Sequence, residues 1–228
     1  MAPPGNSKTT ADELTKAYAD DIKGKIILTT GVSPKSIGST FVQSIASAKP
    51  SLLILAGRNT AKIQTTADEI TSANPDVKVR LLTLDLGSLA QVREAAAEVN
   101  SWEDVPNIDV LVNNAGIMAV PYKLSAEGYE SQFSTNHLGH FLFTNLIMDK
   151  LLKSNEKGWT PRVVSVASDA HRFSGIRWAD INFSVRFASL RLGKASLIAS
   201  LPNRTEKPTT DSLPTASPRR PTCSSLFG

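Results

Sequence analysis

Several common features are scarce or missing in this 228-residue chain. Its single cysteine, Cys223, excludes an internal disulfide and favours a reducing compartment. No apolar run approaches the roughly 18 residues that a membrane-spanning helix needs. The polar start, Met1–Asp21, lacks the apolar segment of a secretory signal. We therefore expect a cytoplasmic protein with no membrane span.

A net positive charge is missing from the part of the chain before Arg186, although the formal net charge of the whole chain is +4. Seven basic and two acidic residues lie from Arg186 onward, so this end carries +5 and the rest of the chain −1. Nucleic-acid binding requires basic residues clustered on a folded face, so we expect no nucleic-acid partner. His137, His140 and His171 lack the spacing of zinc ligands, so we expect no metal site.

The chain does contain a regular alternation of apolar strands and amphipathic helices. Apolar, β-branched runs predict strands at Lys25–Thr30, Ser51–Ala56, Val77–Leu84, Asp109–Asn113 and Arg162–Val166. Helical periodicity or capping signals predict helices at Thr10–Ala19, from Gly38 through Ile45, at Thr60–Ser72 and Leu89–Val99, and around Glu127–Ser134 and Leu138–Leu152. Apolar strands separated by helices predict a parallel sheet covered on both faces. The predicted fold class is α/β, a Rossmann-type doubly wound sheet.

The loop from Thr30 to Gly38 lies where such folds bind the pyrophosphate of a dinucleotide. Only Gly31 and Gly38 are glycines in it, so the loop taken alone is equally consistent with an ordinary strand-to-helix turn. Because Gly38 is not followed by lysine, the loop is not a phosphate loop of the Gly-Lys-Ser/Thr type.

Charged residues after the next two strands refine this prediction. Arg58 follows the second strand, where an acidic residue binds the ribose of NAD and an arginine suits the 2′-phosphate of NADP. Lys35 and Lys62 could add positive charge, and a solvated loop arginine is the alternative. Asp85 ends the third strand, where it could contact the adenine amino group or cap a helix.

Six stretches in this order resemble the short-chain dehydrogenase/reductase family. The resemblance covers about Ile22–Phe183 and rests on Thr30-Gly31 with Ile37-Gly38, Leu55–Arg58, Asp85-Leu86, Asn113–Gly116, Asn136–Phe141 and Arg162–Ser168. Each stretch is common by chance, but all six in order are not. The Leu-Gly-His-Phe and Ser-x-Ala-His stretches are similar to the retinol-dehydrogenase-like branch, which acts on bulky carbonyls.

The resemblance implies an NADP-dependent oxidoreductase that transfers hydride between nicotinamide and a small-molecule carbonyl or alcohol. Ser168 matches the serine that orients the substrate oxygen, and Asn136 the asparagine that holds a water in the proton relay. A strand-end hydroxyl and a helix-interior amide are the alternatives. The implied cofactor-binding residues, which favour NADP(H) over NAD(H), are Gly31, Ser33, Lys35, Ile37, Gly38, Arg58, Asp85, Leu86, Asn114, Ala115 and Gly116.

The chain also departs from the family pattern. Lys35 and Ser36 stand where this loop usually has glycine. The catalytic Tyr-x-x-x-Lys pair is absent, because every tyrosine lies at or before Tyr129 and Lys194 has Leu190 four residues before it. The last two strands and their helices are also missing. We therefore expect an incomplete sheet whose fifth strand is an uncovered edge, and no dimer through the missing helix.

The segment 184–228 is rich in Ser, Pro and Arg, which is typical of a disordered tail. Shifted codons, each built from the last base of one codon and the first two of the next, give another interpretation. Over Pro214–Thr222, synonymous choices then permit Tyr-Gly-Gln-Ser-Lys-Thr-Ala-Asn, the missing segment. We hypothesise that the tail is read out of frame, after an unspliced intron beginning near Val185 or after an insertion or deletion.

The sequence thus predicts a helical extension at 1–21, a Rossmann domain at 22–183 and the tail at 184–228. It leaves three functions open. They are an NADP-dependent oxidoreductase, a nucleotide-binding remnant without catalysis, and an interaction protein acting through its basic tail.

Overall fold

A five-stranded parallel sheet forms the centre of the protein. The computed structural model describes residues 5–6, 8–156, 158–173 and 175–184. The sheet has the order β3-β2-β1-β4-β5. Successive strands are added on one side of β1 up to β3 and then on its other side from β4, so the strand order reverses between β1 and β4. The strands are β1 (Ile26–Thr30), β2 (Leu52–Gly57), β3 (Val79–Thr83), β4 (Val110–Asn113) and β5 (Arg162–Ser165). In doubly wound folds, ligands bind at such a reversal, outside the carboxyl ends of the strands.

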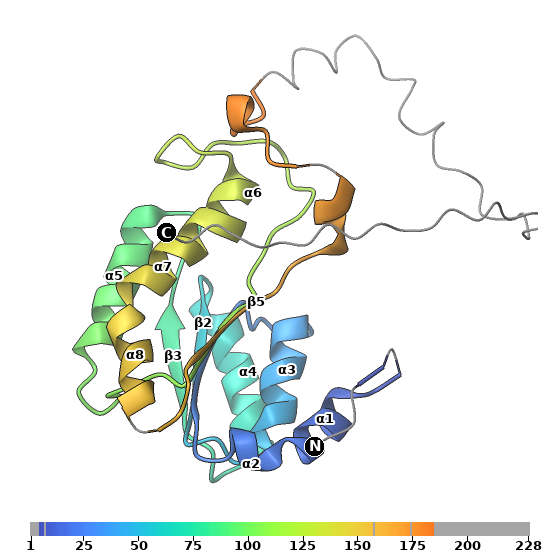
Figure 1. The fold of residues 1–228 in the computed structure, drawn as a ribbon, viewed down its shortest axis with the longest axis vertical. Helices are drawn as coiled ribbons and strands as arrows, with labels where there is room; N and C mark the ends of the chain where they lie inside the picture. Colours follow the sequence, from blue (N-terminus) through green and yellow to red (C-terminus); the bar gives the residue numbers. More distant parts are fainter. Residues whose placement is uncertain (1–4, 7, 157, 174, 185–228) are drawn as a thin grey trace, which may run out of the picture. The chain divides into compact units, whose positions relative to one another are not determined.

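Helices cover both faces of the sheet (Figure 1), with α3 and α4 on one face and α5, α7 and α8 on the other. Strands β1 to β4 therefore contribute alternate side chains to two separate cores. Leu53 and Leu55 belong to the α3–α4 core, and Ile54 between them belongs to the other. The helices are α1 (Ala11–Ala17), α2 (Ala19–Ile22), α3 (Ile37–Ala46), α4 (Thr60–Ala73), α5 (Leu89–Ser101), α6 (Ser131–Phe133), the π-helix η1 (Ser134–Leu138), α7 (Gly139–Leu146), α8 (Met148–Glu156), and the short 3-10 turns η2 (Asp169–Phe173) and η3 (Trp178–Asp180).

The predicted fold class is confirmed, and the predicted strands agree with the observed ones to within about two residues at each end. The capping box at the start of α1 is also present. Thr10 Oγ1 accepts the Glu13 N–H, and the Glu13 carboxylate accepts the Thr10 N–H.

The helix predicted around Glu127–Ser134 is shorter and begins later. Residues 124–130 close on themselves through an antiparallel bridge between Leu124 and Glu130. The Glu130 carboxylate then caps α6 by accepting the N–H groups of Gln132 and Phe133 at 2.9 and 2.8 Å. A capping carboxylate at this position sets the start of the helix, whatever the periodicity upstream.

The fifth strand is exposed, as predicted. β5 pairs with β4 alone among the strands of the described residues. Val163 and Val164 are each 45% exposed although both are apolar. Strands of parallel sheets are normally buried on both faces, so β5 is the least protected strand of the sheet.

At the amino ends of the strands, a buried carboxylate forms hydrogen bonds to several elements. Asp109 is 6% exposed. Its side chain accepts the Ile26 N–H at 2.7 Å, the Asn107 amide at 3.0 Å and the Ser154 hydroxyl. Its backbone carbonyl accepts the Arg162 N–H. This residue therefore connects β1, β4, β5 and α8 at the edge away from the carboxyl ends of the strands.

Candidate cofactor cavity and active-site residues

A cavity of about 520 Å³ opens at the carboxyl ends of the strands. It is lined by the segments that follow β1, β2, β3 and β4, together with one residue of η1. Its lining consists of Thr30, Gly31, Val32, Ser33, Ser36, Ile37, Gly38, Ala56, Gly57, Arg58, Asn59, Lys62, Ile63, Leu84, Asp85, Leu86, Asn114, Ala115, Gly116, Ile117 and Thr135. The structure thus brings together ten of the eleven residues predicted to bind the cofactor. The exception is Lys35, which does not line the cavity.

The loop after β1 reaches the cavity through two close backbone approaches. Gly31 has a φ of +74°, and a Cβ there would overlap the backbone of Ala115. A Cβ on Gly38 would overlap the Gly31 carbonyl oxygen and lie 2.5 Å from Asn114 Nδ2. Both positions therefore require glycine for steric reasons, and together they bring the amino end of α3 against the loop after β4.

The amino end of α3 is capped within the same loop. Ser36 Oγ accepts the Ser39 N–H at 3.1 Å, and Ser39 Oγ accepts the Ser36 N–H at 3.0 Å. Ser36 therefore replaces glycine at a position where its hydroxyl has a capping role. The capped helix still presents Ile37 and Gly38 to the cavity.

Lys35 stands in the left-handed backbone region, with a φ of 62°. This conformation costs a side-chain-bearing residue about 1–2 kcal/mol, and glycine adopts it freely. Glycine is expected at this position because it adopts the left-handed backbone without strain, whereas Lys35 adopts it at a cost.

Replacing Lys35 by glycine is expected to raise the free energy of unfolding by about 0.5–1 kcal/mol, because the strain is removed and only part of it is offset by the added freedom of the unfolded chain. Urea unfolding of the purified chain measures the change. Lys23→Gly is the matched control, because Lys23 has an ordinary φ of −54° and its replacement should lower stability. A loss of stability in both variants would contradict the expectation.

Two exposed cations border the cavity beside the loop after β2. Arg58 and Lys62 line it, and Asn59 Oδ1 accepts the Lys62 N–H at 3.0 Å to cap α4. After the neighbouring strand β3, Asp85 Oδ1 accepts the Gly87 N–H at 2.9 Å. The N-cap of α5 is Ser88, so the helix-cap interpretation of Asp85 is wrong.

Asn136 lies in the π-helix η1, at the side of the cavity. Its side-chain amide pairs with the backbone of Ile117, accepting the N–H at 2.8 Å and donating to the carbonyl at 2.9 Å. The Gly139 N–H bonds to the Ser134 carbonyl, five residues back. Such π segments are frequent at functional sites. Asn136 is thus fixed against a residue that lines the cavity, and it is not an ordinary helix-interior amide.

Ser168 follows β5 and is exposed. Its carbonyl oxygen accepts the backbone N–H of His171 at 3.1 Å and contacts His171 Nδ1 at 2.7 Å. Two residues earlier, the Val166 N–H bonds to the Asn113 carbonyl, which places this segment beside the end of β4. Ser168 and Asn136 therefore both flank the loop after β4, although neither lines the cavity.

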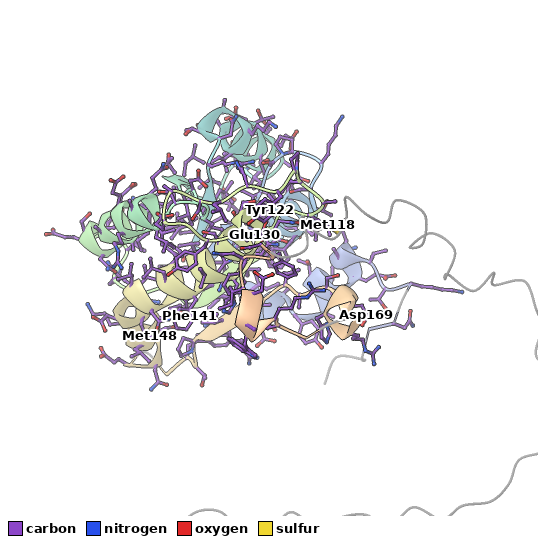
Figure 2. All side chains as sticks on the ribbon, turned by 90° about the horizontal axis from the view of Figure 1, so that it is seen from above. Met118, Tyr122, Glu130, Phe141, Met148 and Asp169 are labelled. Atoms are coloured by element: carbon purple, nitrogen blue, oxygen red, sulfur yellow. The ribbon has the colours of Figure 1, made fainter. Side chains whose placement is uncertain are left out.

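The segment between β4 and α6 carries two of the three tyrosines, and Met118, Tyr122 and Glu130 mark it in the view from above (Figure 2). Tyr129 is 40% exposed. Lys194, Cys223 and the predicted tail from residue 185 onward fall outside the described residues.

Within the described part of the chain, no three His, Cys, Asp or Glu side chains come together as a metal site. None of the helices described there is long and apolar enough to span a bilayer.

The sheet order and the cavity at its carboxyl edge define a Rossmann-type protein. Comparison with known proteins identifies its family: residues 6–180 match the short chain dehydrogenases. The chain therefore belongs to the short chain dehydrogenase family.

Among curated relatives, oxidoreductase fscI of Fusarium equiseti is 32% identical over 176 residues, which cover 77% of this chain and 67% of fscI. Retinol dehydrogenase 13 of Homo sapiens is 36% identical over 165 residues, which cover 72% of this chain and 47% of the relative. The chain thus spans between about half and two thirds of the length of these relatives.

Solved structures agree with the fold. A protein of Mycobacterium paratuberculosis has a TM-score of 0.58 and 35% identity, covering 73% of this chain and 55% of its own. A short chain dehydrogenase of Salmonella enterica has a TM-score of 0.57 and 25% identity, covering 75% and 68%.

Proposed function

We propose that this chain provides the NADP(H)-binding part of an oxidoreductase that interconverts a carbonyl and an alcohol. The observation that carries the proposal is the cavity itself. Its lining combines two glycines whose close neighbours leave no room for a side chain, a capped helix terminus and two cations. Backbone N–H groups at a helix amino end favour a pyrophosphate. A Cβ at Gly31 or Gly38 would overlap neighbouring atoms and displace the turn that holds these N–H groups in place.

NADP(H), rather than NAD(H), is favoured by the charge next to the loop after β2. Arg58 and Lys62 line the cavity there. Arg58 stands where an NAD-binding chain would have a carboxylate to bind the free ribose 2′-hydroxyl. A guanidinium binds a 2′-phosphate through charge-assisted hydrogen bonds. Asp85 lines the same cavity after the neighbouring strand β3, where it suits the adenine amino group.

Replacing Arg58 by alanine is expected to weaken NADPH binding about 10- to 100-fold, because a hydrogen bond to a charged group contributes about 1.5–3 kcal/mol. NADH binding should change little, since NADH lacks the phosphate. Fluorescence titration of both nucleotides measures the two dissociation constants. Arg93→Ala, on α5 and outside the cavity lining, is the matched control. Equal weakening of NADPH and NADH by Arg58→Ala would rule out a 2′-phosphate contact.

In the chemistry that we propose, bound NADPH supplies a hydride to a carbonyl carbon. The protein's part is to orient the substrate oxygen through Ser168 and to hold a relay water near Asn136. The family resemblance supports both roles, and the placement of both residues beside the loop after β4 is consistent with them.

The substrate is proposed to be a bulky apolar carbonyl or alcohol. Relatives named retinol dehydrogenase 13 and polyprenol dehydrogenase support this class. Large apolar side chains are also exposed on segments after β4 and β5, with Met118 at 84%, Ile176 at 55% and Trp178 at 76% exposure. An apolar ligand would cover such surface favourably.

The proton donor is proposed to be encoded in another reading frame of the segment Pro214–Thr222. Eight consecutive shifted codons there permit the family's Tyr-x-x-x-Lys segment. Sequencing the mature transcript across the codons for Asp180–Thr222 tests this directly. A restored frame would support it, and a transcript that encodes the tail as written would refute it.

A nucleotide-binding remnant is the second candidate function. It is favoured by the contrast between a nearly complete cofactor cavity and a sequence without the Tyr-x-x-x-Lys pair. NADPH binding without turnover of any carbonyl would identify this case.

A further inference from the structure

A buried histidine connects the proposed cofactor cavity to the turn that holds Asn136. His140 lies on α7 and is 6% exposed. Its Nε2 is 2.9 Å from Thr30 Oγ1, and its Nδ1 is 3.2 Å from the Asn136 carbonyl oxygen. Neither the cofactor chemistry nor the proton relay proposed above uses this imidazole.

The hydrogen bonds of Thr30 determine which ring nitrogen carries the proton. Thr30 Oγ1 accepts the N–H groups of Asn114 at 3.0 Å and Ala115 at 2.9 Å. A hydroxyl has two lone pairs and one proton, so only the proton of Thr30 remains to be donated. His140 Nε2 at 2.9 Å is a nearer acceptor than the Val112 carbonyl at 3.5 Å. Nε2 must then be unprotonated.

The other nitrogen follows from the same assignment. A neutral imidazole with a bare Nε2 carries its proton on Nδ1, which can then donate to the Asn136 carbonyl. The ring is therefore complementary to both neighbours in one tautomer alone. An imidazolium would place an N–H against a Thr30 hydroxyl whose lone pairs are already occupied.

The electrostatic surroundings agree with a neutral ring. Burial lowers the pKa of His140 below its ordinary value, although its bond to the Asn136 carbonyl opposes this. His137 on η1 lowers the pKa of His140 further by charge repulsion. Thr30 from β1 contributes an uncharged hydroxyl.

We propose that His140 is a positioning residue whose neutral Nδ1–H tautomer links Thr30 to the Asn136 carbonyl. Through Thr30 it fixes the backbone of Asn114 and Ala115, which line the cavity. Through the Asn136 carbonyl it fixes the π-helix η1, whose Asn136 side chain pairs with the backbone of Ile117. The inference rests on the proposed function, because the geometry that it protects is that of the cofactor cavity beside the catalytic asparagine.

The test compares four variants of the full chain: His140→Leu, Thr30→Val, the double variant and Thr30→Ser. NADPH titration should show about tenfold weaker binding for His140→Leu, which corresponds to the loss of one hydrogen bond of about 1.4 kcal/mol. The loss should be larger for Thr30→Val, because valine also removes the acceptor of the Asn114 and Ala115 N–H groups. The double variant should bind no more weakly than Thr30→Val, because that substitution already removes the link to His140. Thr30→Ser keeps the hydroxyl and should bind NADPH more tightly than Thr30→Val does.

His137→Leu is the matched control, because His137 lies on the adjacent turn and is exposed. It should leave NADPH binding unchanged. If His140→Leu lowers the melting temperature and leaves the NADPH dissociation constant unchanged, the residue is merely structural and the proposal is overturned. Additive losses in the double variant would also overturn it.

The tautomer of His140 can be measured directly in the wild-type protein, without a variant and without bound cofactor. Nitrogen-15 NMR of the wild-type ring at pH 7.5 should show a protonated Nδ1 and a bare Nε2. An Nε2–H ring or an imidazolium would overturn the link, even if His140→Leu does not fold. If the wild type binds no NADPH, the proposed function fails. The link between Thr30 and His140 is then still decided by this spectrum and by the coupling of the two substitutions in thermal unfolding.

Discussion

The 228-residue protein is expected to reduce carbonyls with NADPH at least about 10³-fold more slowly than the protein translated from a transcript that restores Tyr-x-x-x-Lys. Proton transfer from a positioned side chain contributes about 10²–10⁴-fold to such reactions. None of the three tyrosines, at positions 18, 122 and 129, is followed by a lysine four residues later. Steady-state loss of NADPH absorbance with an apolar aldehyde or ketone measures both proteins.

Two comparisons make this result specific. Phenylalanine in place of the restored tyrosine should return the rate to that of the 228-residue chain, while NADPH binding stays the same. Turnover by the purified 228-residue chain within tenfold of the restored protein would show that a different group donates the proton. In that case the missing pair would have no bearing on its activity.

The second large effect is expected at Gly38, where alanine should weaken NADPH binding on the order of 10- to 100-fold. The added Cβ would overlap the Gly31 carbonyl and the Asn114 amide nitrogen. Neither neighbour can move freely, because Asn114 Nδ2 donates to the carbonyls of Thr30 and Gly31 at 2.8 and 3.1 Å. Overpacking of this kind costs about 1–3 kcal/mol, and every 1.4 kcal/mol is a factor of ten in affinity.

Gly175→Ala is the control for this substitution, because a Cβ there meets nothing within 4 Å. It should leave both the NADPH dissociation constant and the melting temperature unchanged. Gly38→Ala should raise the dissociation constant even at temperatures where circular dichroism shows the variant fully folded. Wild-type affinity in folded Gly38→Ala would mean that the turn after β1 does not contact the nucleotide.

The sequence predicted the sheet well because its strands are short apolar runs bounded by polar turns. The region from Ser51 to Ala56, for example, has no helical periodicity and too few residues for a buried helix. The position of their loop after the first strand indicates a role for Gly31 and Gly38, and their contacts with Ala115 and Asn114 explain why both must be glycine.

Two parts of the site could not be predicted, for different physical reasons. The π-helix at Ser134–Leu138 depends on one extra residue in a turn, and hydrophobic periodicity near 3.6 cannot resolve a single insertion. The contact between Thr30 and His140 joins residues 110 positions apart. The sequence places His140 in the Leu-Gly-His-Phe stretch and gives it no zinc-ligand spacing, but a lone histidine does not reveal its partner.

The start of α6 was misjudged because Glu130, rather than the upstream residues, caps it. Glutamate is not among the residues preferred at a helix N-cap, so the sequence does not mark Glu130 as the start of the helix. The positive φ of Lys35 was foreseeable in part, since the family's glycine at that position indicates a left-handed backbone.

The buried carboxylate of Asp109 has a consequence for how such a chain changes over generations. The bonds that hold β1, β4, β5 and α8 together lie at the amino edge of the sheet, and the groups proposed for chemistry lie at the carboxyl edge. Mutations that remove a catalytic group therefore leave this network intact. A chain of this fold can therefore lose a proposed catalytic group and still keep the folded sheet with the cavity at its carboxyl edge.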